Sequence, residues 1–278
     1  GRIMKKLKSF LTNPQTVTGL VILVIMLGLA ALAPVICPGN PLFSVGKPLQ
    51  APGGDFIMGT DYLGRDVWAM LVWGSRISII FAFGASLLSL IVGIVLGALS
   101  GYIGGWFDDL MCRIFELFYI IPRTFLVILM VAFFGSSVGL MVIIIGITIW
   151  PSNAKIMRAQ VLTLKSRGYV QAGNVAGGTK LGILFKHIVP NGMGPVLSNS
   201  ILQMAQAVLT EASLSFLGLG DPNRASWGLI LNAGQKHINS APWLVIYPGI
   251  ALALLLLAFN LIGTALHKTL NVKQAAME

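Results

Sequence analysis

Six stretches of the chain are apolar for long enough to cross a membrane, and none shows the alternation typical of a β-strand. A helix needs about 20 mostly apolar residues to span the hydrocarbon core. Only helices and closed barrels satisfy their backbone groups in lipid, and unbroken apolar runs favour helices. The sequence therefore predicts an all-α polytopic membrane protein with six transmembrane helices, at residues 17–37, 77–100, 110–134, 138–157 (interrupted by Pro151), 188–217 and 243–266.

The first apolar stretch has flanks like those of a signal peptide. It follows the basic residues Arg2, Lys5, Lys6 and Lys8, and Ala31-Leu32-Ala33 imitates a small-residue cleavage site. Its apolar run is longer than the roughly 7–15 residues of a signal-peptide core. We therefore expect a retained anchor.

Composition supports a protein solvated mostly by lipid. Only 10% of the residues are charged, against about 25% in ordinary soluble domains, and 56% are hydrophobic. A soluble globular enzyme and a disordered tail are thereby excluded. A disulfide scaffold is excluded because there are two cysteines, Cys37 and Cys112, which are expected near opposite membrane faces.

The net charge of +10 has two explanations, nucleic-acid binding or the positive-inside bias of membrane proteins. The basic residues lie between apolar runs rather than in one soluble segment, which favours the membrane explanation and no nucleic-acid partner. With six spans, thirteen lysines and arginines fall on the side of the termini and five on the other, with Arg123 inside a span. Both termini are therefore expected in the cytoplasm.

The same pattern divides the chain into four parts. Residues 1–37 form a cytoplasmic segment and the first helix, and residues 38–76 an external loop. This loop ends in a short interfacial helix over 67–73, for which Asp61 or Asp66 is a candidate cap. Residues 77–270 form a five-helix core that includes a basic cytoplasmic loop, 158–187, and residues 271–278 form a tail.

No constellation of catalytic or metal-binding residues is visible. The three histidines are scattered, and no serine or cysteine lies beside a plausible base. Residues 173–180 come close to a phosphate-binding loop, but Thr179 and Lys180 are in the reverse order. The sequence therefore predicts no catalysis, no metal and no cofactor bound by this chain.

Two ionisable residues, Arg123 and Glu211, lie inside predicted spans, where a charge costs about 2.5–3.5 kcal/mol. They are candidates for the translocation path, although a structural pair with each other or snorkelling of Arg123 explains them equally well. Glu116 is expected to pair with Arg113. Small residues recur every four positions at 85, 89, 93, 97, 101 and 105, which predicts a close helix crossing, either internal or against a partner.

Several strings together resemble one transporter family. They are Gly-Thr-Asp-x-x-Gly-Arg-Asp at 59–66, Gly-Tyr-Ile-Gly-Gly-Trp at 101–106, Glu-Ala-Ser-Leu-Ser-Phe-Leu-Gly-Leu-Gly at 211–220 and Ala-Phe-Asn-Leu-Ile-Gly at 258–263, with a loop at 169–191. In this order they resemble the C-type integral permease subunit of peptide/nickel-type (dipeptide/oligopeptide) ABC importers, over residues 15–270.

The resemblance implies a type I ABC importer permease fold in a bacterial or archaeal cytoplasmic (inner) membrane. It implies a second, B-type permease subunit, two ATP-binding subunits that carry ATP and Mg, and an external solute-binding protein. The permease would alternate the access of its cavity as a rigid-body switch. Peptides are the expected solutes; nickel or a metal chelate, glutathione and oligosaccharides remain alternatives. Rival classes are a passive channel and a membrane scaffold.

The loop resembles the one through which such permeases dock on their ATPases. The docking residues implied are Tyr169, Gln171, Ala172, Gly173, Gly177, Gly178 and Thr179, with a sharp turn at Gly177-Gly178 between two short helices. Gln171 departs from the usual acid and Gly173 from the usual alanine, which lowers helix propensity by about 1 kcal/mol. Thr264 and His267 depart from an Asp and an Arg near the C-terminus.

Overall fold

The computed structural model describes residues 10–275 and the side chains of residues 10–270, except that of Asn174. The basic residues ahead of the first helix, Arg2 to Lys8, lie outside the described residues, and so does the end of the predicted tail. Over the described residues the fold is helical, with isolated β-bridges but no strand. The predicted all-α fold is confirmed.

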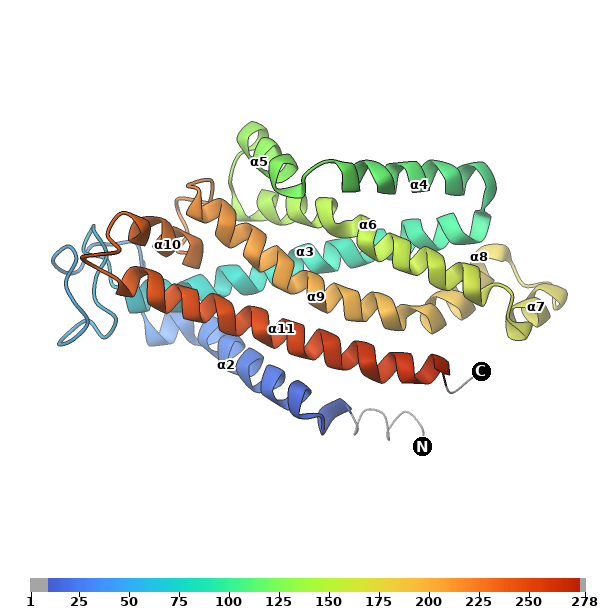
Figure 1. The fold of residues 1–278 in the computed structure, drawn as a ribbon, viewed down its shortest axis with the longest axis horizontal. Helices are drawn as coiled ribbons and strands as arrows, with labels where there is room; N and C mark the ends of the chain where they lie inside the picture. Colours follow the sequence, from blue (N-terminus) through green and yellow to red (C-terminus); the bar gives the residue numbers. More distant parts are fainter. Residues whose placement is uncertain (1–9, 276–278) are drawn as a thin grey trace.

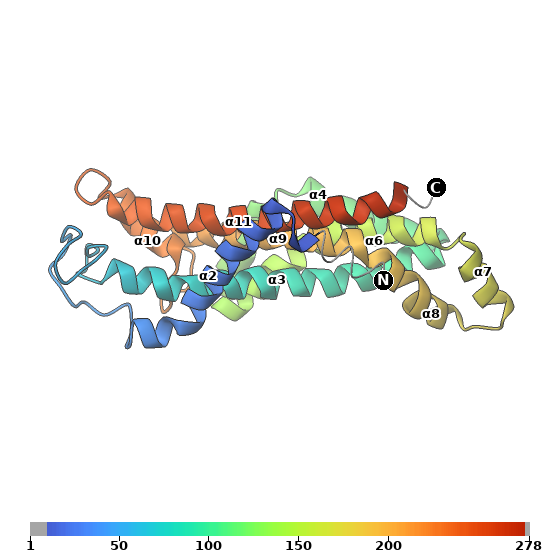
Figure 2. The same cartoon turned by 90° about the horizontal axis from the view of Figure 1, so that it is seen from below.

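Long helices run side by side along the bundle (Figure 1). These long helices are α2 (Pro14–Ile36), α3 (Val67–Ile103), α6 (Val138–Leu164), α9 (Val189–Phe216) and α11 (Trp243–Ala275). Figure 2 shows α7 (Gly168–Val175) and α8 (Lys180–Ile183) at one end of the bundle, and α10 (Trp227–Gln235) with the loop that precedes α3 at the other.

In the described part of the chain, four helices are long and apolar enough to cross a membrane, or five if the bent pair of α4 (Gly105–Ile120) and α5 (Arg123–Phe134) is one span. Six spans were predicted, and the one not counted here is α9. That helix has 28 residues, about 42 Å at 1.5 Å per residue, so its length suffices. It is less apolar because it carries several amides and hydroxyls, and many of them are buried against α3 and α6.

The third predicted span is not one straight helix. The chain turns by 88° between α4 and α5, at Ile121 and Pro122. Proline has no amide hydrogen, and its ring pushes the preceding residue out of the helical region; Ile121 accordingly has φ −76° and ψ 125°. Pro151, by contrast, does not interrupt α6, where it is buried among neighbouring helices.

The predicted interfacial helix over 67–73 is also wrong as a separate element. These residues are the first two turns of α3, which continues without a break for 37 residues. No proline lies inside α3, and Gly74 is kept helical where the Trp227 ring packs on it. Asp66 caps this longer helix, because its carboxylate accepts a hydrogen bond from the Trp68 amide at 3.0 Å.

The stripe of small residues on α3 makes an internal crossing with α6. A Cβ atom added at Gly93 would lie 2.5 Å from Asn153 Cβ, and one at Gly97 would overlap the backbone of Ala154. The close approach excludes water and lets the two backbones pack directly. Gly105, the last residue of the stripe, has no atom within 4 Å of such a Cβ and takes no part.

A buried polar network joins the same crossing to α9. Asn153 Nδ2 donates to Gln203 Oε1 at 2.8 Å and to Ser89 Oγ at 3.1 Å, and Ser89 Oγ also donates to Gln203 Oε1 at 2.8 Å. Asn199 Nδ2 donates to Asn153 Oδ1 at 2.8 Å. Because each amide has partners from other helices, α3, α6 and α9 are held in one register.

Candidate functional site

The connection between α6 and α9 projects from one end of the bundle as an elbow, which we define as residues 168–188 (Figure 2). Its two short helices, α7 and α8, meet at Gly177, whose φ of +79° is the left-handed conformation that glycine adopts without strain. Gly178 N donates to Gly173 O at 3.1 Å, and Thr179 Oγ1 caps α8 by accepting from Gly182 N at 3.2 Å. The turn and the pair of helices lie where the sequence predicts them.

The underside of the elbow is anchored in the bundle. Four of its apolar side chains are buried together with Ala98 of α3 and with Met157 and Val161 of α6; they are Val170, Ile183, Leu184 and Ile188. Burying each such side chain contributes about 1.5–3 kcal/mol. Because of these contacts, a force on the elbow is passed to α3, α6 and α9 rather than absorbed by a loose loop.

The outer side of the elbow is exposed and apolar at its tip. Val175 is 90% exposed, and Tyr169 and Leu181 are also exposed. The predicted docking residues Gln171, Ala172, Gly177, Gly178 and Thr179 are exposed as well, and Gly173 is half-buried. The structure therefore gathers all seven predicted residues on one projecting element; their docking role stays a prediction.

An ion pair braces the bundle beside the elbow. Arg158 of α6 forms a two-pronged pair with Asp108 in the first turn of α4, and Ser100 Oγ of α3 donates to the same carboxylate. Lys165 Nζ donates to Gly101 O at 3.2 Å. These contacts tie the end of α6, where the elbow begins, to α3 and α4. Sequence reasoning missed this pair, since its members are 50 residues apart.

The predicted path residues Arg123 and Glu211 do not meet. Arg123 is the first residue of α5, directly after the bend, and its Nη1 donates to Gln206 Oε1 of α9 at 2.8 Å. Glu211 is only 2% exposed and accepts from Ser215 Oγ at 2.7 Å through Oε1. The structure thus leaves Arg123 half-buried and places Glu211 inside the bundle. The predicted pair of Arg113 and Glu116 is present at 3.2 Å.

The partner of Arg123 belongs to a polar stripe on α9 that sequence reasoning missed. Gln206 and Thr210 follow at helical spacing, and Ser213 continues the row. The hydroxyls of Thr210 and Ser213 donate back to the carbonyls of Gln206 and Leu209, both at 2.7 Å. Spacings of four and three residues within an apolar segment were the available signal. Charged side chains at membrane depth, such as Arg123 beside this stripe, face either the interior of a helix bundle or a water-filled cavity.

Residues 59–66 form a compact loop at the end of the bundle opposite the elbow. Asp61 Oδ1 accepts from the amides of Leu63 and Arg65 at 2.8 and 2.9 Å. Thr60 O accepts from Trp243 Nε1 of α11 at 3.1 Å, so this loop is hydrogen-bonded to the start of the last helix. Of the two candidate caps, Asp66 caps α3, whereas Asp61 stabilises the turn that precedes this helix. Cys37 and Cys112 are both free thiols.

Comparison with known proteins places this fold in a family. Residues 93–274 match the family described as binding-protein-dependent transport system inner membrane component. The chain is 36% identical over 269 residues to the oligopeptide transport system permease protein OppC of Bacillus subtilis, which covers 95% of this chain and 87% of that protein. It is 34% identical over 274 residues to the di/tripeptide transport system permease protein DppC of Pseudomonas aeruginosa, covering 96% and 90%.

The fold is also similar to a solved structure of the MetNI methionine ABC transporter in inward facing conformations. The TM-score is 0.52 at 17% identity, and the match covers 72% of this chain and 97% of that one. At this identity the likeness concerns the fold alone, and it agrees with the family match. The chain therefore belongs to the family of binding-protein-dependent transport system inner membrane components, and it is a multi-pass permease subunit of an ABC importer.

Proposed function

We propose that this permease forms half of the translocation pathway for di- or oligopeptides, together with a second, B-type permease subunit. Two separate ATP-binding subunits, which hold ATP and Mg, drive it by docking on the elbow, and an external solute-binding protein delivers the solute. The chain itself binds no cofactor and performs no covalent chemistry. Its termini and elbow lie in the cytoplasm, and the loop at residues 59–66 lies on the external side. The peptide solute is suggested by relatives 36% and 34% identical, which are an oligopeptide and a dipeptide transport system permease protein.

The observation that carries the proposal is the construction of the elbow. It has an anchored apolar underside and an exposed tip at Val175, and it is continuous with α6 and α9, the two helices bonded to each other through Asn153 and Asn199. A domain that closes on the tip would move these helices as one body, which is the rigid-body mode of switching. A passive channel or a scaffold does not require a projecting element that is rigidly coupled to the membrane helices.

The test is ATP-driven uptake into proteoliposomes that contain the importer reconstituted with its partners. The solute is a radiolabelled dipeptide, and nickel, glutathione and an oligosaccharide are measured as rival solutes. Val175→Asp places a charge on the docking tip and is expected to lower uptake and co-purification of the ATP-binding subunits at least tenfold. Val45→Asp is the matched control, since Val45 is 62% exposed at the opposite end. Uptake that needs no ATP, or that responds equally to both variants, contradicts the proposal.

Arg123 is proposed to help select solutes that carry a carboxylate. Arg123 is half-buried beside the polar stripe of α9, and its guanidinium is held there by Gln206. Arg123→Gln should reduce dipeptide uptake roughly tenfold, the loss expected for a charged hydrogen bond. Arg113→Gln is the control, because Arg113 is exposed and contacts Glu116 alone among the ion pairs of the described residues. Unchanged uptake with unchanged assembly would defeat this role.

A further inference from the structure

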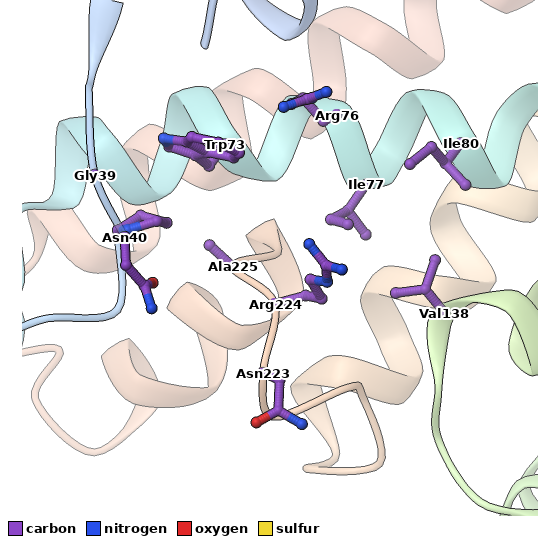
Figure 3. Close-up of a pocket in the computed structure, with 11 residues that line it drawn as sticks. Gly39, Asn40, Trp73, Arg76, Ile77, Ile80, Val138, Asn223, Arg224 and Ala225 are labelled. Atoms are coloured by element: carbon purple, nitrogen blue, oxygen red, sulfur yellow. The ribbon is translucent and has the colours of Figure 1, made fainter. Parts of the chain in front are cut away.

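A cavity of about 470 Å³ opens at the end of the bundle opposite the elbow. One wall is a single face of α3, where Trp73, Arg76, Ile77 and Ile80 follow at helical spacing. The other walls are segments that lie beyond helix ends, residues 39–41 and 223–225, with Val138 from the start of α6. Figure 3 shows Arg224 reaching from its loop toward α3. The cavity thus lies between loops and a helix face, at the mouth of the bundle.

The cavity has positive charge and no carboxylate among its lining residues. Arg76 lies 5.2 Å from the centre of the Trp73 ring, which holds it against α3. Within the described residues, neither Arg76 nor Arg224 takes part in an ion pair. Two guanidinium groups at one cavity without a counter-ion repel each other and favour a bound anion.

The nearest acidic groups face a different space. Glu211 and Asp221 line a smaller, water-sized cavity together with Ser226, and Arg224 lines both this cavity and the larger one. Asp221 is engaged with backbone, because its Oδ1 accepts from the Asn223 amide at 3.0 Å and its Oδ2 from the Val138 amide at 3.4 Å. Glu211 accepts from Ser215. Asp221 holds the loop, and neither carboxylate is ion-paired with Arg224 within the described residues, so the guanidinium is available to the larger cavity.

The remaining lining groups indicate what kind of anion fits. Asn40 Oδ1 already accepts from the Leu42 amide at 3.0 Å, so the side chain has its NH₂ group left to donate. Asn223 supplies a second amide, and Ile77, Ile80 and Val138 supply an apolar floor. A guanidinium binds a carboxylate through two parallel hydrogen bonds, and amides pair with peptide groups. The volume lies in the range of about 300–1,000 Å³ that is typical of small-molecule pockets.

We propose that this cavity is an entry site that binds the free carboxylate of a small solute, of the size and chemistry of a dipeptide, through Arg224 with Arg76. The amide of Asn40 contacts its peptide group and the isoleucines contact its side chain. This inference rests on the proposed function for the direction of transport and the class of solute. It adds a binding site on the permease itself, separate from Arg123 and from the elbow.

Equilibrium binding to the full chain tests the inference. The chain is placed in nanodiscs of neutral phosphatidylcholine and titrated by calorimetry with alanyl-alanine, and then with its C-terminal amide, which lacks the carboxylate. We expect alanyl-alanine to bind and the amide to bind at least tenfold more weakly. Arg224→Gln should weaken alanyl-alanine binding by about tenfold to a hundredfold, and Arg224→Lys by less, since it keeps the charge but loses the fork. Lys236→Gln, which removes an exposed charge at the same end outside the cavity, should change nothing.

Three results overturn the inference: no binding of alanyl-alanine, equal binding of the dipeptide and its amide, or binding that Arg224→Gln leaves unchanged. Nanodiscs that contain phosphatidylglycerol supply a further arm. If Arg224→Gln alters retention of that lipid and not of the dipeptide, the cavity is a headgroup site and the inference is wrong. Uptake is a separate readout: binding at Arg224 without ATP-driven uptake overturns the proposed function alone, and uptake with no binding at Arg224 overturns this inference alone.

Discussion

At the scale of single residues, the elbow depends on two glycines four positions apart that have opposite requirements. Gly177 has a φ of +79° and nothing within 4 Å of an added Cβ, so its conformation alone demands glycine. Gly173 is in the interior of α7, and a Cβ there would meet Ile183 at 3.7 Å, an ordinary contact. One position is therefore constrained by backbone conformation, whereas the other tolerates a side chain.

Gly173→Ala and Gly177→Ala should have opposite effects on the elbow. Alanine at 173 is expected to stabilise α7 by about 1 kcal/mol through its higher helix propensity, and alanine at 177 to destabilise the turn by about 1–2 kcal/mol. Hydrogen exchange of the α7 amides measures both, slowing about fivefold in the first variant and accelerating in the second. Equal effects of the two variants would contradict the assigned conformations.

The intramembrane charges show what residue-level reasoning from sequence can and cannot provide. The cost of a charge in lipid singles out Arg123 and Glu211 from sequence alone. Their partners depend on the bend at Pro122 and on the direction in which α9 faces, and neither follows from spacing along one segment. Gln206 and Ser215, the observed partners, are therefore known only from the structure.

At the scale of elements, α3 and α6 cross with their backbones in direct contact at Gly97 and Ala154. Gly97→Ala forces a methyl group into the Ala154 backbone and should lower the free energy of unfolding by about 1–3 kcal/mol. Gly28→Ala on α2 is the matched control, because nothing lies within 4 Å of its added Cβ, and it should be neutral or slightly stabilising. Thermal unfolding in detergent checks both, and a stable Gly97→Ala would show that the two helices are not in backbone contact.

The cap of α3 makes the stability of the helix start depend on pH. Burial raises the pKa of the Asp66 carboxyl above its ordinary value of 3.8, although the amides of Trp68 and Ala69 lower it. The folded state therefore binds the proton more tightly than the unfolded state, and the free energy of unfolding falls as pH rises from 3.8 through the raised pKa.

Substitutions at Asp66 separate its charge from its cap. Asp66→Asn should keep the cap and remove this part of the pH dependence, whereas Asp66→Ala should remove both and be about 1 kcal/mol less stable than Asp66→Asn at every pH. Unfolding midpoints across the acid range distinguish the variants. An unchanged pH profile in Asp66→Asn would show that this carboxyl does not titrate differently on folding.

Breaks in helices were the weakest part of the sequence-based prediction. Pro122 and Pro151 are both prolines in apolar segments, yet the first bends the chain by 88° and the second is absorbed by α6. The difference lies in their surroundings, because Pro151 is buried in a helix that packs against α3 and α9, whereas Ile121 and Thr124 beside Pro122 are exposed. Tertiary packing, which periodicity does not report, decides whether a proline ends a helix.

At the scale of the whole molecule, the chain is a long bundle with a lever at one end and a cationic cavity at the other. The helical fold, the segment positions and the place of the elbow follow from hydropathy and glycine chemistry, so they were accessible from sequence. The cavity was not, because it joins residues near 40, 76 and 224, which only the folded bundle brings together.

The central claim is that the elbow lies in the cytoplasm and is the contact point of the ATP-binding subunits. The direct measurement uses Val175→Cys and, as control, Val45→Cys, each in a chain with Cys37→Ser and Cys112→Ser. In intact cells, a membrane-impermeant maleimide should label position 45 and not position 175. In inside-out vesicles, a short bismaleimide should link position 175, and not 45, to an ATP-binding subunit. Labelling of position 175 from outside, or no link to such a subunit, would contradict the account.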